Sequence, residues 1–196
     1  VIIATGSVHT SLPGIDFDEK IIVSSTGVLK LDKVPKKMVV VGGGYIGLEM
    51  GSVWSRLGAE VHVVEFLDHI TPGMDKEISN EFMKILKKQG IKFHMQHKVD
   101  KIEKKNSSAV ISTTDKDGNK KDFDCEVVLV SVGRKPNTEG LNLKKIGVNL
   151  DDKNRIQTDK NFKTNLDNIY ELGDVNSGPK LALKSEDDGI AVAENI

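Results

Sequence analysis

Three glycines directly follow a run of apolar residues, and a carboxylate ends the next apolar run. The stretch from Met38 to Glu65 reads MVVVGGGYIGLEMGSVWSRLGAEVHVVE. Gly42, Gly44 and Gly47 have the spacing G-x-G-x-x-G, which binds the diphosphate of a dinucleotide where a strand turns into a helix. The first glycine permits a tight turn, the second lets a diphosphate approach the backbone, and the third permits close helix–strand packing. The free amides and the dipole of the helix N-terminus then favour the diphosphate.

The carboxylate predicts which dinucleotide binds. Glu65 lies 18 residues after Gly47, at the end of the second apolar run. A carboxylate there accepts hydrogen bonds from the adenosine ribose and repels a 2′-phosphate, so NAD is favoured over NADP. The next residues, FLDH, contain no Lys or Arg that could hold such a phosphate. The alternative is a glycine turn with no ligand, and the coincidence of strand, helix and closing acid argues against it.

Alternating strands and helices must position these residues. We predict buried strands over residues 1–5, 38–41, 60–65, 91–95, 127–132 and 169–172, and helices over 45–57 and 76–88. A short helix follows SST, and the sequence between residues 100 and 126 indicates an antiparallel meander with a hairpin turn at Asp117-Gly118. The strand–helix–strand order predicts an α/β, Rossmann-like βαβ domain. It has a parallel sheet, helices on one face and the meander on the other.

Composition excludes several classes of protein. The chain has 196 residues, 28 Lys and Arg against 29 Asp and Glu, and a net charge of −1, which argues against a nucleic-acid footprint or a polybasic membrane anchor. No apolar run reaches the roughly 18 residues of a membrane span. Cys125 is the only cysteine, so the chain holds no disulfide or redox pair of its own. The five histidines show no metal-ligand spacing, and we expect no metal site. The apolar start VIIATGS and the helical end KSEDDGIAVAENI suggest a piece of a longer protein.

Several motifs in one order resemble the flavoprotein disulfide reductases, a family of pyridine nucleotide–disulfide oxidoreductases. The matching segments are VIIATGS, KMVVVGGGYIGLEMGSVWSRLGAEVHVVE, VLVSVGRKPNT and NIYELGDV. GSVWSRLGAEVHVVEF and GPKLALKSEDDGI narrow the resemblance to the NAD-dependent member that oxidises dihydrolipoamide. The resemblance implies electron transfer through a disulfide and FAD to NAD. It also implies three parts: residues 1–30 end a first FAD-binding segment, 31–157 form the NAD-binding domain, and 158–196 begin a second FAD-binding segment.

The resemblance also implies roles for individual residues on the NAD side. Glu49 matches an acid near the nicotinamide, Val99 matches a residue touching the adenine, and Gly133 lets the chain pass close to NAD. An ordinary surface role for Glu49 and a core role for Val99 are the alternatives. The full NAD set is Gly42, Gly43, Gly44, Tyr45, Ile46, Gly47, Leu48, Glu49, Glu65, Val99 and Gly133.

A second set of matching residues concerns FAD. Asp174 matches the acid that binds the flavin ribityl chain, with a helix-capping turn as the alternative. The family commonly has Met in place of Lys180 and His in place of Leu183, so a side-chain role of that His is lost here. The full FAD set is Thr5, Gly6, Ser7, Asp174, Lys180, Leu181, Ala182 and Leu183. No catalytic residue is assigned within the chain.

For the whole protein, the resemblance implies a homodimer that serves as a subunit of 2-oxo acid dehydrogenase complexes. The resemblance also implies a lipoyl domain as the substrate. It is compatible with a bacterial cytoplasm or the mitochondrial matrix. Nucleic acid and membrane are not expected partners. Two alternatives stay open: another disulfide reductase, or a stand-alone nucleotide-binding module, because the chain lacks two redox cysteines.

Overall fold

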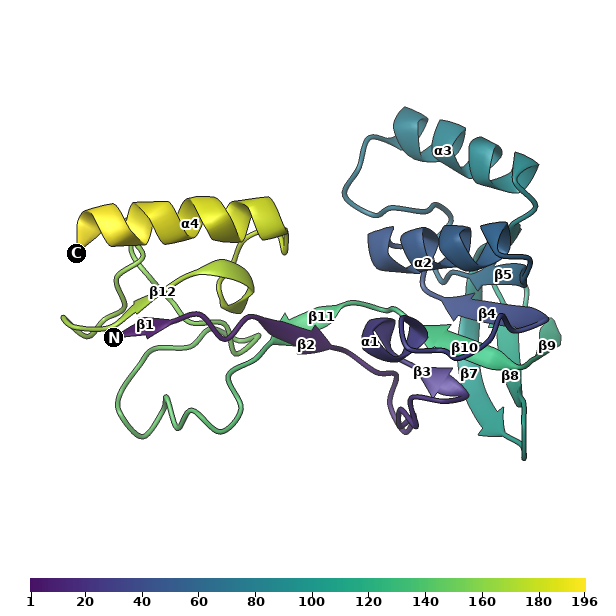
Figure 1. Ribbon diagram of the computed structural model, residues 1–196, viewed down its shortest axis with the longest axis horizontal. Coiled ribbons are helices and arrows are strands. Elements are labelled where there is room, and N and C mark those ends of the chain that lie inside the picture. The colour runs from purple at the N-terminus through teal and green to yellow at the C-terminus, as the bar shows by residue number, and fades with distance from the viewer. The chain divides into compact units, whose positions relative to one another are not determined.

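The computed structural model describes residues 1–196, which divide into two compact units (Figure 1). His9–Gly133 form the larger unit, and Val1–Val8 with Arg134–Ile196 form the smaller one. No helix in either unit is long and apolar enough to span a bilayer.

A five-stranded parallel sheet organises the larger unit. Its strand order is β3 (Ile22–Val23), β10 (Val127–Val130), β4 (Lys37–Val41), β5 (Glu60–Val64) and β6 (Lys92–His94). Val41 pairs with Val130 on one side and with Val64 on the other, so the central strands end level with one another. The residues that follow these strands therefore meet at one edge of the sheet, which is where α/β folds place their ligands.

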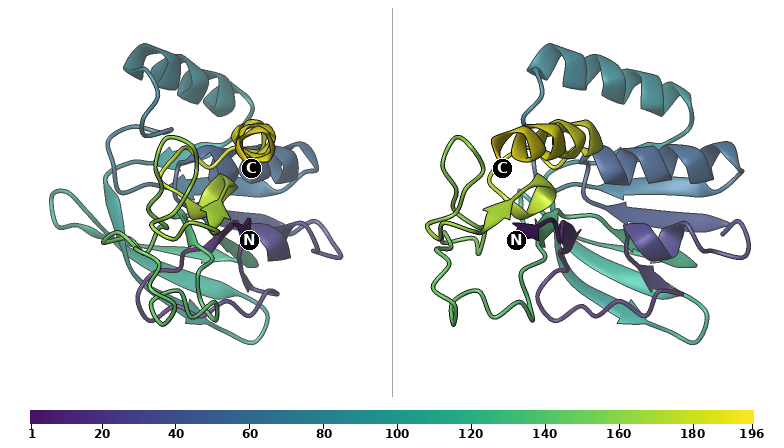
Figure 2. Two further views of the ribbon diagram at one scale, coloured as in Figure 1. Left: turned by 90° about the vertical axis from the view of Figure 1, so that its left-hand side faces the viewer. Right: turned by 60° about the vertical axis from the view of Figure 1, so that its left-hand side comes forward.

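Helices cover one face of this sheet, and an antiparallel meander covers the other (Figures 1 and 2). Met38, Val40 and Val63 pack with the helices α1 (Ser25–Val28), α2 (Tyr45–Arg56) and α3 (Lys76–Lys88). Val39 and Val64 instead pack on the meander of β7 (His97–Lys104), β8 (Ala109–Asp115) and β9 (Lys120–Cys125). The alternation follows from the two-residue period of a strand. The predicted parallel sheet, with helices on one face and the meander on the other, is confirmed.

The buried face of α2 does not follow from its apolar residues alone. Val53 and Leu57 belong to the regular apolar spacing of this segment, yet both are exposed. Gly47, Leu48, Gly51, Ser52 and Trp54 are buried instead. A glycine-lined face brings the helix axis closer to the sheet than a face of branched side chains would. Similarly, α3 buries Ser79 and Leu86, while the apolar residues Ile78, Phe82 and Ile85 are exposed.

The smaller unit has its own apolar core, formed by Ile3, Leu143, Val148, Ile156, Ile169 and Val175. Its elements are β1 (Ile2–Ile3) paired in parallel with β12 (Tyr170–Glu171), β2 (Ser7–His9) paired with β11 (Arg134–Pro136), the 3₁₀ turn η1 (Gly173–Val175) and α4 (Ala182–Asn195). The β2–β11 pair was not predicted, because each strand has only three residues and no apolar alternation.

The compact units divide the chain after Val8 and after Gly133, whereas the predicted domains divide it after residues 30 and 157. The difference arises because β3 pairs with β10 in the larger sheet, while residues 143–156 contribute to the smaller core. The cofactor assigned to each predicted domain stays a prediction.

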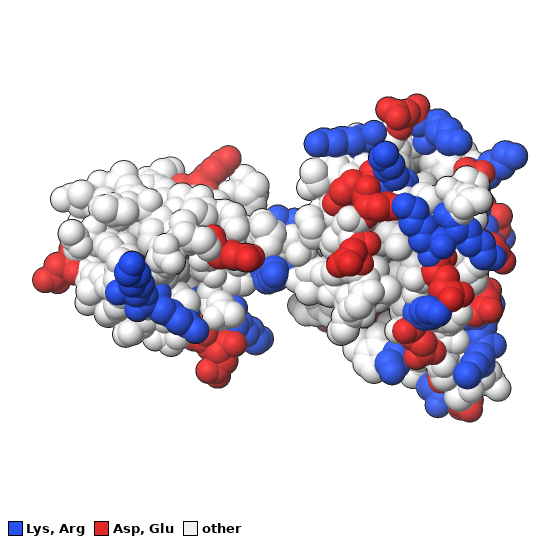
Figure 3. All heavy atoms as spheres, turned by 90° about the horizontal axis from the view of Figure 1, so that it is seen from below, with Lys and Arg blue, Asp and Glu red and all other residues white.

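Charges of both signs are interspersed on the face of the larger unit that Figure 3 shows. Lys101–Glu103, Lys92–Glu60 and Lys104–Asp18 form ion pairs on this unit. The near-neutral composition therefore reflects local mixing of charges.

Candidate functional site

The glycine loop joins β4 to α2 in the geometry that the spacing predicts. Gly42 has a φ of +105°, and a Cβ there would lie 2.6 Å from the Ser131 carbonyl oxygen. A Cβ on Gly47 would lie 2.3 Å from the Gly42 carbonyl oxygen. A Cβ on Gly44 would meet no atom within 4 Å. Gly42 and Gly47 are therefore required by packing, whereas Gly44 faces open space.

The open space adjoins the N-terminus of α2. Gly44 is the N-cap of this helix, and no side chain caps it. The first amides of a helix have no partner within the helix, so they are available to an anion. A diphosphate fits this arrangement by two criteria, unhindered approach at Gly44 and uncapped amides beside it.

Glu65 lies at the end of β5, as predicted, and is almost fully buried. Its Oε2 accepts a hydrogen bond from the Gly43 amide at 2.5 Å, and its Oε1 accepts one from the Leu67 amide at 2.8 Å. The carboxylate therefore fixes the middle of the glycine loop. Each carboxylate oxygen has a second lone pair, so a ribose hydroxyl can still donate to it.

The other predicted NAD residues lie in the same unit. His97 donates its amide to the Glu65 carbonyl at 2.9 Å, which places the start of β7, and with it Val99, next to the end of β5. Val99 is half-buried and packs against the meander-side core, which is consistent with the alternative core role. Glu49 is exposed on the first turns of α2. Gly133 is exposed, with a φ of +125°, and accepts the Thr10 amide.

Residues predicted to contact FAD come together in the smaller unit. The Ser7 hydroxyl donates to Asp174 Oδ2 at 2.6 Å and accepts from Arg134 Nε at 2.6 Å. Thr5 donates its hydroxyl to the Asn137 carbonyl, and Gly6 accepts the Asn137 amide. Asp174 does not cap η1, so the alternative capping role is not observed. Its Oδ1 has no protein partner and is available to a ligand hydroxyl, which fits the polar chain of a flavin cofactor.

Arg134 contacts Ser7, a predicted FAD residue, and the motif analysis did not single it out. Its guanidinium binds both the hydroxyl and the carbonyl oxygen of Ser7, 127 residues away in sequence. The residue stands in the quoted segment VLVSVGRKPNT, but nothing in that segment indicates its partner.

Comparison with known proteins decides the family. Residues 1–189 match the family described as pyridine nucleotide-disulphide oxidoreductase. The chain belongs to this family. The predicted resemblance is thereby confirmed.

Two curated relatives and one solved structure illustrate the similarity. The chain is 52% identical to the dihydrolipoamide dehydrogenase of Chaetomium thermophilum over 198 residues, and 51% identical to the mitochondrial dihydrolipoyl dehydrogenase of Pisum sativum over 197 residues. The match covers 100% of this chain and 39% of each relative. The HOCl-induced flavoprotein disulfide reductase RclA from Escherichia coli has a TM-score of 0.86 at 27% identity, covering 100% of this chain and 44% of that one. The chain thus spans about two-fifths of the curated relatives' length.

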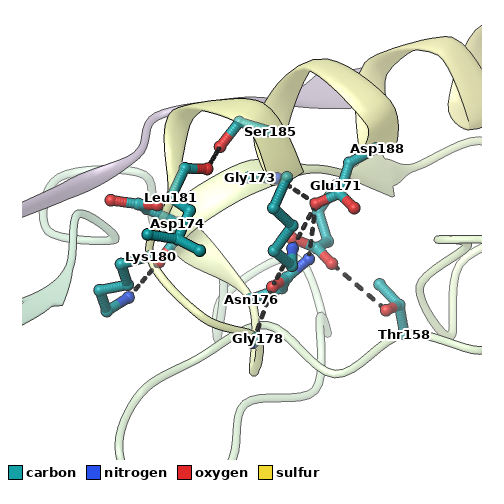
Figure 4. A network of polar contacts seen from close by, with 11 residues as sticks. Thr158, Glu171, Gly173, Asp174, Asn176, Gly178, Lys180, Leu181, Ser185 and Asp188 are labelled. Atoms are coloured by element: carbon teal, nitrogen blue, oxygen red, sulfur yellow. Dashed lines mark hydrogen bonds and ion pairs between the residues drawn. The ribbon is translucent and has the colours of Figure 1, made fainter. Parts of the chain in front are cut away.

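Lys180, one of the two departures from the oxidoreductase pattern, lies beside Asp174 (Figure 4). Lys180 Nζ donates to the Asp174 carbonyl oxygen, and partial burial lowers the pKa of this lysine. Leu181 and Leu183 are exposed at the start of α4. The segment therefore presents apolar side chains next to a cation, and its contribution to FAD binding stays a prediction.

Two buried acidic residues, Glu171 and Asp188, lie next to the turn η1 (Figure 4). Glu171 is fully buried, accepts one hydrogen bond from the Thr158 hydroxyl at 3.2 Å, and leaves Oε2 without a partner. Burial raises the pKa of Glu171 to about 7. Asp188 is also buried, but it accepts the Gly173 amide and pairs with Lys184. Burial of Glu171 without a partner for Oε2 therefore favours its protonated form.

The single thiol and the histidines have structural surroundings. Cys125 is buried at the end of β9, and burial raises the pKa of its thiol to about 12. His62 Nδ1 lies 3.0 Å from His94 Nε2, and burial lowers the pKa of both rings, that of His94 to about 4. No three His, Cys, Asp or Glu side chains in residues 1–196 form a group that could hold a metal ion.

Proposed function

We propose that this chain is the NAD-binding part of a dihydrolipoamide dehydrogenase, together with adjoining segments that contact FAD. The observation that carries the proposal is the loop from Gly42 to Gly47. It joins a strand to an uncapped helix, leaves open space at Gly44 and is tied to Glu65. The proposal is supported by 52% identity to a relative that carries this enzyme name.

On this proposal, the chain's own residues bind and orient the nucleotide. The open side of Gly44 and the first amides of α2 receive the diphosphate, which needs both unhindered approach and unpaired donors. Glu65 accepts from the adenosine ribose and excludes a 2′-phosphate by charge repulsion. Glu49, Val99 and Gly133 line the remainder of the NAD site.

The smaller unit would hold part of FAD in the same way. Ser7 and Arg134 orient the Asp174 carboxylate, whose free Oδ1 accepts from a ribityl hydroxyl. When bound, FAD and NAD supply the redox chemistry that takes electrons from dihydrolipoamide through a disulfide. The disulfide must come from outside this chain, because Cys125 is alone and buried.

For the whole protein we propose a homodimer within 2-oxo acid dehydrogenase complexes, acting on lipoyl domains. Either a mitochondrial matrix or a bacterial cytoplasm is compatible with this role. By itself, the chain is a nucleotide-binding module without turnover, as the buried single thiol indicates. The alternative of an NADPH-dependent disulfide reductase is disfavoured, since the Glu65 carboxylate would repel a 2′-phosphate.

Calorimetry with NAD and NADP tests the proposal. A charge-assisted hydrogen bond contributes about 1.5–3 kcal/mol, so Glu65→Ala should weaken NAD binding by roughly 10- to 150-fold. The affinity for NADP should fall less in this variant, because the charge that repels the 2′-phosphate is also removed. Glu65→Arg should favour NADP over NAD.

The ratio of the two affinities is the decisive quantity. Glu65 also holds Gly43 and Leu67, so a loosened loop would weaken both nucleotides in parallel and leave the ratio unchanged. Glu103→Ala removes an exposed carboxylate on β7 and serves as the control. If the wild-type chain binds neither nucleotide, or if Glu65→Ala retains the wild-type ratio, the ribose assignment is wrong.

A further inference from the structure

Thr71 adopts a backbone conformation that its residue type and its neighbour both oppose. Its φ is +50°, a value uncommon for any residue but glycine and an outlier for a β-branched one. Pro72 follows directly, and the residue before a proline is normally extended. Such a conformation persists only where its surroundings over-determine it, and these positions cluster at ligand sites.

The surroundings of Thr71 are a set of hydrogen bonds to two different elements. Its amide donates to the Gly43 carbonyl oxygen at 2.8 Å, and its Oγ1 lies 2.7 Å from the Ser79 hydroxyl on α3. Its own carbonyl accepts the Met74 amide at 3.1 Å. Thr71 and Ser79 are both almost completely buried. Every polar group of Thr71 is therefore satisfied in this one conformation.

The other end of these contacts is the centre of the glycine loop. The Gly43 carbonyl oxygen accepts a hydrogen bond from the Thr71 amide, and the Gly43 amide donates one to Glu65. Both backbone polar groups of Gly43 are therefore occupied. The side chain of Ile70 lies against Gly43, 3.2 Å from where a Cβ would stand. Gly44, the next residue, has open space beside it. We call Thr71, with its hydrogen bonds to Gly43 and Ser79, the clamp. Together with Glu65, the clamp fixes the peptide units on both sides of Gly43, directly before the open space at Gly44.

We infer that Thr71 is a positioning residue for the dinucleotide. Through Gly43, it holds the loop so that Gly44 and the first amides of α2 face the diphosphate. This inference rests on the proposed function, since it needs a diphosphate at Gly44. A glycine at position 71 would relieve the backbone strain, but it would lose the hydroxyl that anchors the turn to Ser79. Thr71 therefore adopts an unfavourable backbone conformation, and its hydrogen bonds in that conformation fix the loop.

Substitutions at both ends of the clamp separate positioning from folding. Thr71→Gly removes strain and hydroxyl together, Ser79→Ala removes the other hydroxyl, and Thr71→Ser retains the hydroxyl without the β-branch. Asn154→Gly is the control, because Asn154 also has a positive φ, +57°, but lies in the smaller unit. NAD and adenosine binding to the 196-residue chain are measured by calorimetry, and the unfolding temperature by circular dichroism.

We expect Thr71→Gly and Ser79→Ala each to lower the affinity for NAD about tenfold, which is the effect of losing one hydrogen bond. Adenosine has no phosphate, so its affinity should not change, and the unfolding temperature of Thr71→Gly should not fall. Thr71→Ser should bind NAD as the wild type does. The double variant should lose no more than Thr71→Gly alone, because both changes break one contact.

Two outcomes overturn the inference while leaving the proposed function intact. In one, wild type binds NAD and both clamp variants bind it equally well. In the other, affinities for NAD and adenosine fall together with the unfolding temperature, which indicates a folding role only. Absence of NAD binding by the wild-type chain would instead refute the proposed function, and the inference with it.

Discussion

Replacing Gly44 with alanine should abolish tight NAD binding without destabilising the fold. The added Cβ meets no protein atom within 4 Å, and the backbone at this N-cap is extended, with φ −78° and ψ 178°. Alanine is a poorer N-cap than glycine, which sets the folding cost at no more than about 1 kcal/mol. The same methyl group occupies the space through which a diphosphate approaches. Loss of one charge-assisted hydrogen bond there would weaken NAD roughly 10- to 150-fold.

The other glycines of α2 give matched comparisons with opposite expected outcomes. A Cβ on Gly47 would lie 2.3 Å from the Gly42 carbonyl oxygen and 2.6 Å from Ser131 Oγ. Overpacking of this kind costs about 1–3 kcal/mol, only partly offset by the ~1 kcal/mol that alanine gains over glycine within a helix. A Cβ on Gly51 would lie 3.4 Å from Val61 Cγ1, an ordinary contact, so only the helical gain applies.

The assay combines thermal unfolding with NAD calorimetry on the three alanine variants. The net cost of Gly47→Ala is up to about 2 kcal/mol. At about 2–4 °C per kcal/mol for a chain of this size, this variant should lower the unfolding temperature by up to about 8 °C. Gly51→Ala should raise it by about 2–4 °C with NAD affinity unchanged. Gly44→Ala alone should lose NAD affinity at a nearly wild-type unfolding temperature. Wild-type NAD affinity in Gly44→Ala would refute the reasoning, because the open space beside Gly44 would then not be the diphosphate site.

Three further predictions concern flavin, turnover and pH. The purified chain should be colourless, because the FAD contacts proposed for Ser7 and Asp174 would reach only part of the cofactor; stoichiometric absorbance at about 450 nm after gel filtration would contradict this. It should show no dihydrolipoamide–NAD activity, since the buried Cys125 thiol, with a pKa of about 12, is neither paired nor ionised; activity that Cys125→Ser abolishes would require a single-thiol mechanism. Burial raises the pKa of Glu171 from 4.5 to about 7, so the folded chain retains a proton that the unfolded chain has lost, and the free energy of unfolding should fall as pH rises through this window. Glu171→Gln should remove that dependence and stabilise the chain by up to about 3 kcal/mol at about pH 8, with little change near pH 5. If the unfolding temperatures of the wild type and the variant changed equally with pH, Glu171 would not titrate in this window.

The sequence by itself determined the elements and the glycine loop. The strand at 38–41, the helix beginning at Tyr45 and the acid at Glu65 follow from local periodicity and residue type, and the structure places them as predicted. The helix over 76–88 coincides with α3. These features depend on neighbours within one or two turns or on a fixed motif spacing, so a single chain segment contains the information.

Only the tertiary structure decided which groups these elements bring together. Glu65 binds the Gly43 amide 22 residues earlier, and Ser7 binds Asp174 across 167 residues, with no local pattern to indicate either pair. The buried face of α2 depends on how closely its glycines approach the sheet, and the apolar spacing does not show this, since Val53 and Leu57 are exposed. Thr71 is the clearest case: its residue type and the following proline oppose its backbone conformation, and hydrogen bonds to Gly43, Ser79 and Met74 hold it there.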